Sequence, residues 1–480
     1  MNAIALRGAV IAALLALAGC AGPMVAGNAQ QVTKQVLSDD GLSELSVPES
    51  WVSRPDVVRS ATLRLGGEAS DVFLVVNTYP HGELQTTPAA FARSMADNLA
   101  EALGNGRVTA QRTLSIGGRP AHEYVVSGGV EDGLLTYVST VVEGERSLHN
   151  LLGWTASADY SGRGHVLHKA IATFRESATP RQAKQRVDLT FDWPEQLDYT
   201  TRFHGKSKKR SGSYELKGVY RNSVRPSGDH YLQVQTRVQR QEYVSDNPGR
   251  NDSLQKVLDQ ISSQVPDYLI TREGEFAQVQ DLAEFQRRME RALFDGLPKG
   301  EAGASGEMVQ RMKAALSEQF LAAAAMDEWN RSVGGWIDSA YVVGEVYPTL
   351  EEYRAPALGE RNYPMRVTRQ LAGTAPCFEG DTSYRCVHLI YTGTVSDASF
   401  RADMARFLES VVGPAVKLND VVITRRTDVI SHPQTLLPFR TVSTETKTIT
   451  LTDPTGEVVS NEDREEITAI YSYQESTAAR

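Results

Sequence analysis

The chain has 480 residues, of which 41% are hydrophobic and 23% are charged, proportions that are ordinary for water-soluble globular proteins. Its formal net charge of -9 argues against general nucleic-acid binding, which requires a basic face that releases counterions. Beyond the N-terminal segment no apolar stretch approaches the length of a membrane span, and the length predicts roughly two to four domains.

A secretory signal is predicted over residues 1–19. Arg7 precedes an apolar run from Gly8 to Ala18, which suits the core of a signal peptide and is too short for a stable membrane span. The run closes with Leu17-Ala18-Gly19-Cys20, which resembles the lipobox of bacterial lipoproteins. This resemblance implies cleavage before Cys20 and lipidation of its thiol. The alternative is an ordinary signal peptide in which the cysteine occurs by chance.

The same resemblance implies where the protein is held. Several acyl chains on one residue give stable anchoring, because the buried methylenes of each chain add up. Ala21, rather than an aspartate, follows the cysteine. By resemblance to lipoprotein sorting in Gram-negative bacteria, this residue implies the outer membrane, with the protein facing the periplasm. Residues 20–34 are rich in Gly, Ala and Gln and are predicted to form a lipidated, flexible tether.

Residues 35–177 are predicted to form one α+β domain. Segments 61–65 and 71–79 are rich in β-branched and aromatic residues, which indicates strands. Thr87 as an N-cap and Pro88 at the first helical position predict a helix. Its apolar face recurs every four residues and consists of Phe91, Met95, Leu99 and Leu103. Further antiparallel strands joined by Gly-rich hairpins follow, and then a second helix with an apolar face.

This order of elements resembles the PsbP-like and DcrB-like family. The resemblance rests on the entry from Pro48 to Trp51, the aromatic-rich strand before the long helix, the turn Ile116-Gly117-Gly118-Arg119-Pro120-Ala121 and the final helix from Ala170 to Phe174. It covers about a third of the chain and implies an α-β-α sandwich on an antiparallel sheet. These motifs are turn and core residues, so the resemblance implies a fold and assigns no catalytic residue.

A charged segment at 178–186, which contains Pro180, is predicted to be a linker to a second, larger domain at 187–480. Strand patterns before and after a helical insertion at about 252–336 are expected to join in one curved antiparallel sheet that the helices cover. The fold class is therefore predicted to be α+β in both domains. The C-terminal domain matches no family that the sequence motifs identify.

Two cysteines remain after Cys20, and they lie close together. Cys377 and Cys386 flank a Gly-Asp turn, which in an oxidising periplasm predicts a disulfide across a hairpin. By the chain-entropy argument, so short a loop contributes about 2–3 kcal/mol. The alternatives are a zinc site, for which only His388 lies near, and a redox pair, which prefers two residues between the cysteines.

No sequence motif identifies a catalytic or cofactor site, and we expect neither a cofactor nor a metal. No serine occupies a G-x-S-x-G elbow, and no Gly-rich phosphate loop is present. His165 and His168 have a spacing that suits one metal, but no third ligand is visible, so a solvent-facing position is favoured. The segment from Asp246 to Asp252 carries oxygen ligands but departs from a calcium loop and is expected to be a turn.

One basic cluster stands out in this acidic protein. It is predicted to form a loop beside Phe203 that could bind an anionic lipid, lipopolysaccharide or acidic protein partner. The alternative is a solvated hairpin tip with no binding role. The cluster consists of Arg202, Lys206, Lys208, Lys209 and Arg210.

The sequence thus predicts a cell-envelope lipoprotein that is not an enzyme and acts as a binding or assembly module with a protein partner. Two alternatives stay open. One is a carrier that holds a lipid or lipoprotein between the second domain's sheet and helices. The other is a periplasmic hydrolase whose histidine, carboxylate and hydroxyl meet only in the folded protein.

Overall fold

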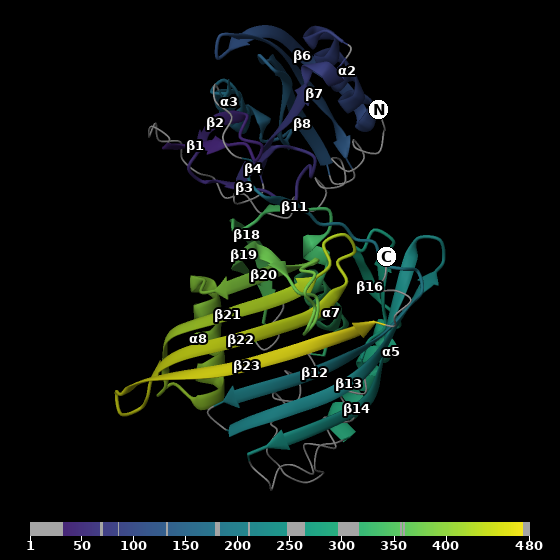
Figure 1. The fold of residues 1–480 in the computed structure, drawn as a ribbon. Coiled ribbons are helices and arrows are strands. Elements are labelled where there is room, and N and C mark those ends of the chain that lie inside the picture. Colours follow the sequence, from purple (N-terminus) through teal and green to yellow (C-terminus); the bar gives the residue numbers. More distant parts are fainter. Residues whose placement is uncertain are drawn as a thin grey trace. The chain divides into compact units, whose positions relative to one another are not determined.

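The computed structural model describes residues 32–67, 71–84, 86–130, 133–177, 183–209, 212–246, 265–295, 316–355, 358 and 361–473. The chain divides into two compact units (Figure 1). Unit 1 comprises residues 1–188 and 339–349, and unit 2 comprises residues 189–338 and 350–480. Both units combine antiparallel sheets with helices, which confirms the α+β class. In the described residues, no helix has both the length and the apolar character needed to cross a bilayer.

Unit 1 is built on a seven-stranded antiparallel sheet with the order β3-β4-β5-β9-β8-β7-β6. The bounds of these strands are β3 Trp51–Ser53, β4 Leu63–Gly67, β5 Val72–Pro80, β6 Gly104–Ile116, β7 Arg119–Val130, β8 Gly133–Glu143 and β9 Ser147–Ala156. A separate three-stranded sheet consists of β1 Thr33–Leu37, β2 Ser43–Pro48 and β10 Arg175–Glu176. A 3-10 turn, η1, covers His81–Glu83.

One helix packs on each face of the seven-stranded sheet, because side chains of successive strand residues point to opposite faces. Helix α2 (Pro88–Ala102) covers a core that includes Phe73 and Trp154, whose rings stack 5.0 Å apart. Helix α3 (Tyr160–Ile171) covers a second core that includes Leu74 and Leu151, both fully buried. Unit 1 is therefore a layered sandwich with two separate cores.

Local sequence explains where α2 begins and ends. The Thr87 hydroxyl accepts a hydrogen bond from the Ala90 amide at 3.2 Å, and Pro88 occupies the first turn, as predicted. The predicted apolar face is largely buried, since Phe91 and Leu99 are at most 5% exposed. After the helix the chain returns so closely that a Cβ on Gly106 would lie 2.1 Å from the Ala100 carbonyl oxygen. Only glycine fits there.

Residues 339–349 belong to unit 1, although the sequence placed them in the second domain. Strand β17 (Ala340–Val342) pairs with β11 (Arg186–Asp188), so the last residue of the predicted linker is part of a strand. The buried Arg64 guanidinium donates to the Ala340 carbonyl at 2.8 Å and to Asp39 at 2.7 Å. A buried guanidinium needs acceptors, and this distant segment supplies one that local periodicity does not reveal.

Unit 2 contains an eleven-stranded antiparallel sheet with the order β16-β15-β14-β13-β12-β23-β22-β21-β20-β19-β18. Strands from both sides of the predicted helical insertion lie in this one sheet, because β12 pairs with β23 (Figure 1). The bounds are β12 Leu197–Lys209, β13 Gly212–Ser227, β14 Tyr231–Ser245, β15 Tyr268–Thr271, β16 Phe276–Val279, β18 Val346–Arg354, β19 Asn362–Ala375, β20 Cys386–Val395, β21 Lys417–Ser431, β22 Pro438–Thr452 and β23 Val458–Tyr473.

Helices cover one face of this sheet, which we call the inner face. The helical elements are α5 Leu282–Asp295, α7 Glu318–Ser332, the 3-10 turn η2 Gly334–Trp336 and α8 Ala398–Val412. Phe400 of α8 is fully buried against the ring of Tyr363 on β19. Asp397 caps α8 by accepting from the Ser399 amide at 2.7 Å.

Candidate functional site

Several predicted site residues lie outside the described residues. Cys20 and most of the tether are among them, so lipidation remains a prediction. Arg210 and the segment 247–252 also lie outside. Asp246 is described, and its carboxylate accepts from the Ser213 amide at 2.8 Å and from the Ser213 hydroxyl at 3.0 Å. That carboxylate therefore joins β14 to β13 in the structure.

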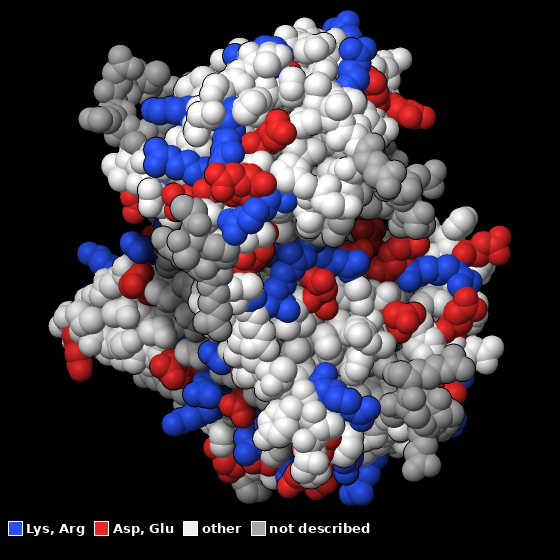
Figure 2. All heavy atoms as spheres, turned by 45° about the horizontal axis from the view of Figure 1, so that its top comes forward, with Lys and Arg blue, Asp and Glu red and all other residues white. Residues whose placement is uncertain are grey.

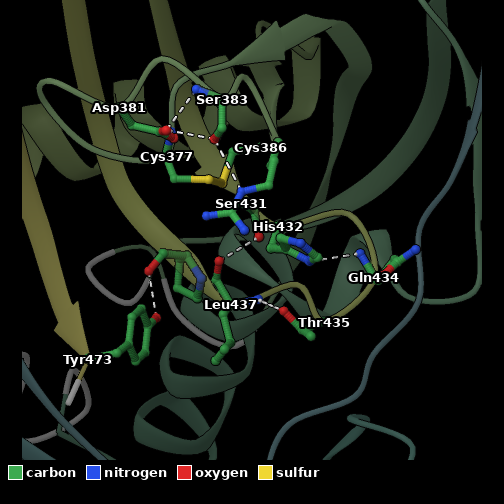
Figure 3. Close-up of a disulfide and its surroundings, with 12 residues drawn as sticks. Cys377, Asp381, Ser383, Cys386, Ser431, His432, Gln434, Thr435, Leu437 and Tyr473 are labelled. Atoms are coloured by element: carbon green, nitrogen blue, oxygen red, sulfur yellow. Dashed lines mark hydrogen bonds between the residues drawn. A yellow bond between two sulfur atoms is a disulfide. The ribbon is translucent and has the colours of Figure 1, made fainter. Parts of the chain in front are cut away.

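A disulfide joins Cys377 and Cys386, as predicted (Figure 3). It closes the connection between β19 and β20, where Ala375 and Cys386 are the last paired residues. The Asp381 carboxylate accepts hydrogen bonds from the Cys377 amide at 2.8 Å and from the Ser383 amide at 2.8 Å. Because both thiols are used in the disulfide, they are not available as zinc ligands. The neighbouring His388 pairs instead with Asp428 at 2.8 Å.

The predicted basic cluster is mostly strand and not a loop. Lys206 and Lys208 lie on β12 with their side chains on the face opposite to the inner face, and both are exposed, as is Arg202. Lys209 alternates to the inner face, where its ammonium lies 5.8 Å from the centre of the Tyr214 ring. The alternation of strand residues therefore divides the cluster between two faces.

Acidic residues on the neighbouring strands lie beside these basic residues and offset their positive charge. Lys206 lies in register with Glu215 on β13 and with Glu466 on β23. Arg464 beside Lys208 already pairs with Glu466 at 3.0 Å. On the face of the molecule in Figure 2, basic and acidic side chains are likewise interspersed. Binding of an anionic partner at this cluster remains a prediction. In the structure, the surface around the cluster carries both basic and acidic side chains.

His168 takes part in a polar network between α3 and the seven-stranded sheet. Its Nδ1 lies 3.2 Å from Glu123 Oε2, and its Nε2 lies 3.0 Å from the Tyr160 hydroxyl. Arg112 donates to the other Glu123 oxygen at 2.6 Å, and Thr140 donates to Oε2 at 3.2 Å. Glu123 is only 2% exposed on β7, so these donors replace the water that its carboxylate loses.

The electrostatics of this network favour a structural carboxylate. Burial alone would raise the pKa of Glu123, but hydrogen bonds from His168 and Arg112 outweigh burial and hold that pKa below its ordinary value. Burial and the nearby Glu123 charge raise the pKa of Tyr160, which disfavours a tyrosinate nucleophile. His165 is exposed on α3. Among the described residues, no three His, Cys, Asp or Glu side chains converge to hold a metal.

Glu123→Gln is expected to lower the free energy of unfolding of unit 1 by about 2 kcal/mol at neutral pH, because a charge-assisted acceptor is lost. A folded-state pKa below the ordinary 4.5 stabilises the fold above that pH, and this stability is lost as the pH falls through the lowered value. The difference between wild type and variant should therefore shrink below about pH 4.5. Urea denaturation of both proteins at several pH values measures this difference in the free energy of unfolding.

The matched control is Glu145→Gln. Glu145 pairs with Arg119, but its side chain is 71% exposed and that of Arg119 is 38% exposed. Exposed pairs contribute at most about 1 kcal/mol, so this variant should be close to wild type at every pH. An equal loss of stability in both variants would contradict the role given to Glu123.

The inner face of unit 2 carries a second polar cluster, which we call the inner ion network. Arg425 on β21 donates to Glu445 on β22 at 2.6 Å and to Asp327 on α7 at 3.2 Å. Lys447 lies 2.9 Å from Glu445. On neighbouring strands Arg369 donates to Glu351 at 2.6 Å, and Tyr391 donates to the same carboxylate at 3.1 Å. Arg331 on α7 also lies 3.4 Å from Asp327. The charged members are Asp327, Arg331, Glu351, Arg369, Arg425, Glu445 and Lys447.

Solvent reaches part of this network. The Arg425 side chain is 19% exposed and that of Glu445 is 25% exposed, whereas Lys447 is 47% exposed. Burial would raise the pKa of Glu445, but the charges of Arg425 and Lys447 outweigh it and lower that pKa. Both carboxylate and guanidinium therefore stay charged on a face that helices cover.

The register across the strands adds like charges. Glu445 pairs directly with Glu465 on β23, a juxtaposition that destabilises a sheet unless cations neutralise it. The next row places Lys447 opposite Asp463. A face with this composition is polar and partly exposed to solvent, so it can bind a ligand through ion pairs and hydrogen bonds. Sequence reasoning missed it, although two charged residues two positions apart on β22, Glu445 and Lys447, were a visible signal.

No protein-family model matches the sequence, and neither does any curated protein. Among solved structures, the cyanobacterial PsbP protein of Synechocystis matches 32% of this chain and 98% of its own, with 11% identity and a TM-score of 0.26. LpqN, involved in cell envelope biogenesis of Mycobacterium tuberculosis, matches 31% of this chain and 93% of its own, with 13% identity and a TM-score of 0.24.

Lipovitellin, in a structure that concerns its lipid–protein interactions, matches 60% of this chain, with 10% identity and a TM-score of 0.26. That match spans only 26% of the lipovitellin chain.

Proposed function

We propose that this chain is a lipid-anchored envelope protein that works by binding and not by catalysis. Its binding surface is the inner face of the unit 2 sheet. The observation that carries the proposal is the partial exposure of charged side chains there, with Lys447 at 47% and Asp327 at 33%. Charged groups that stay partly exposed on a face covered by helices can exchange contacts with water for ion pairs or hydrogen bonds to a ligand.

Site-specific photocrosslinking in intact cells tests this surface. A benzophenone amino acid replaces Lys447 on the inner face, and the control carries it at Arg440, an exposed residue on the opposite face of the same strand. We expect an adduct at position 447 and none at position 440. A small mass increase would indicate an amphiphile, as a carrier requires, and a large one a protein partner. No adduct at 447, or equal adducts at both positions, would contradict the proposal.

The anchor is tested separately with Cys20→Ser. Without the thiol no thioether can form, so we expect the variant either to stay uncleaved at this site or to carry no lipid. Radiolabelled palmitate incorporation and membrane sedimentation provide the readouts. A variant that is processed and sediments as wild type does would show that Cys20 is not the anchor.

A hydrolase is the second candidate, and one observation favours it. In unit 1 a histidine, a carboxylate and a hydroxyl come together as His168, Glu123 and Tyr160. The raised pKa of Tyr160, caused first by burial, makes its hydroxyl a poor nucleophile. Purified wild type and His168→Asn should therefore be equally inactive toward a generic p-nitrophenyl ester. Turnover that disappears in the variant would favour the hydrolase.

A further inference from the structure

The connection between β19 and β20 has a firmly held shape. We call residues 377–386 the disulfide loop, since Cys377 and Cys386 join its ends and both are at most 6% exposed. Asp381 accepts from the amides of Cys377 and Ser383 and from the Ser383 hydroxyl at 2.6 Å (Figure 3). The Asp381 amide in turn donates to the Phe378 carbonyl at 3.1 Å. Covalent and hydrogen-bond constraints thus act on the same ten residues.

This rigid loop presents two aromatic rings to solvent. Phe378 is 59% exposed and Tyr384 is 58% exposed, whereas the next exposed aromatic ring in the described part of the chain, Tyr231, reaches 39%. Tyr384 also has a φ of 50°, a left-handed conformation that a tyrosine disfavours. The loop therefore holds a large side chain in an unfavourable backbone conformation while leaving it outside the core. Such strain persists only where surrounding contacts impose it.

The charges of the loop are nearly balanced. The carboxylate of Asp381 is used inside the loop, and Arg385 donates to the Ser383 hydroxyl at 3.1 Å. Glu379 remains as an exposed acidic side chain. A strongly anionic surface would not attract a loop of this composition, but a neutral lipid interface accepts aromatic rings, with the tyrosine hydroxyl toward the head groups.

We propose that the disulfide loop is a membrane-contact loop, in which Phe378 and Tyr384 enter the interface of a predominantly zwitterionic bilayer. The inference rests on the proposed lipid anchor, which would keep unit 2 near a bilayer and raise the effective concentration of the loop there. The disulfide serves this role by presenting both rings in one shape, so little conformational freedom is lost on insertion.

Tryptophan fluorescence offers a direct test. The five native tryptophans are all at most 7% exposed, so they are shielded from lipid and form a constant background. Phe378→Trp and Tyr384→Trp each place one accessible indole in the loop, and Val458→Trp, at a side chain that is 62% exposed on β23, is the matched control. Each full chain is mixed with vesicles of phosphatidylethanolamine and brominated phosphatidylcholine.

We expect the bromine atoms to quench the loop indoles and leave the Val458→Trp indole unquenched. High salt should change the quenching of the loop indoles little. Equal quenching at position 458, no quenching in the loop, or quenching only when anionic lipid is added would overturn the proposal. An indole in the loop that is already shielded from acrylamide without lipid would indicate a protein contact instead and would also overturn it.

The same measurement on the Cys20→Ser chain separates this inference from the anchor. Without the anchor, vesicle binding should weaken, but any bound chain should still show quenching confined to the loop. In that background Phe378→Ser combined with Tyr384→Gly should lower vesicle binding about tenfold, because two apolar rings no longer leave water. Glycine tolerates the positive φ, so a urea stability no lower than that of wild type will show that the fold is intact. Undiminished vesicle binding would contradict the role of the rings.

Discussion

Trp329→Ala is expected to lower the free energy of unfolding of unit 2 by about 4 kcal/mol, the largest effect of any single substitution considered for this protein. Trp329 is 4% exposed on α7. Its ring lies 5.3 Å from that of Trp193 and 5.9 Å from that of Tyr268. Its indole nitrogen donates to the Gly274 carbonyl at 2.9 Å. The substitution removes aromatic packing and leaves that buried carbonyl without this donor.

The consequence extends to the proposed binding surface, because α7 also carries Asp327, the partner of Arg425. Hydrogen exchange during urea denaturation, followed by mass spectrometry, can assign the loss of stability to the peptides of unit 2. Trp329→Phe serves as the control. It keeps most of the packing and removes the hydrogen bond, so it should cost about 1–2 kcal/mol. A loss as large as that of the alanine variant would show that the hydrogen bond dominates.

Arg425→Met is expected to destabilise unit 2 by about 3 kcal/mol at neutral pH, because it leaves Glu445 and Asp327 without their shared cation. The guanidinium lies between these two carboxylates at 2.6 Å and 3.2 Å. Glu465 pairs with Glu445 across the strands and adds repulsion once the cation is gone. Chemical denaturation with the same exchange readout measures the effect.

The lowered pKa of Glu445 predicts how the stability loss of Arg425→Met varies with pH. In the wild type, cations hold the pKa of Glu445 below its ordinary 4.5, so the pair stabilises the fold above that pH and loses its effect as the pH falls through the lowered value. The deficit of Arg425→Met should therefore be greatest near neutral pH and shrink below about pH 4.5.

Two further variants test the mechanism. Lys447→Met removes the 47% exposed cation and should cost less than about 1 kcal/mol. Arg425→Met combined with Glu445→Met should recover much of the stability lost in the single variant, because no unpaired carboxylate remains on that pair. A double variant no more stable than Arg425→Met would show that packing of the arginine stem, and not charge pairing, carries the effect.

Local sequence signals were sufficient for individual elements. The start of α2 follows from the Thr87 cap, Pro88 and the periodicity of the residues after them. The disulfide was predictable for the same reason, since Cys377 and Cys386 lie nine residues apart around a turn. In each case the deciding interaction is short in sequence.

The basic cluster shows where such reasoning fails. A run of five cations was interpreted as a loop, but strand alternation places Lys206 and Lys209 on opposite faces of β12. One of its acidic neighbours, Glu466, comes from β23, more than two hundred residues later in the chain. Composition alone cannot supply either fact.

The amino-acid sequence by itself determined the α+β class, the start of α2, the cysteine pairing and the lipobox motif that underlies the predicted anchor. Only the tertiary structure decided that residues 339–349 join unit 1, that β12 pairs with β23, and that Arg425, Glu445 and Asp327 meet on one covered face. Periodicity shows which residues of a strand share a face, but it does not show which distant strand lies beside it. The register between distant strands sets the charges that meet, and that register exists only in the folded chain.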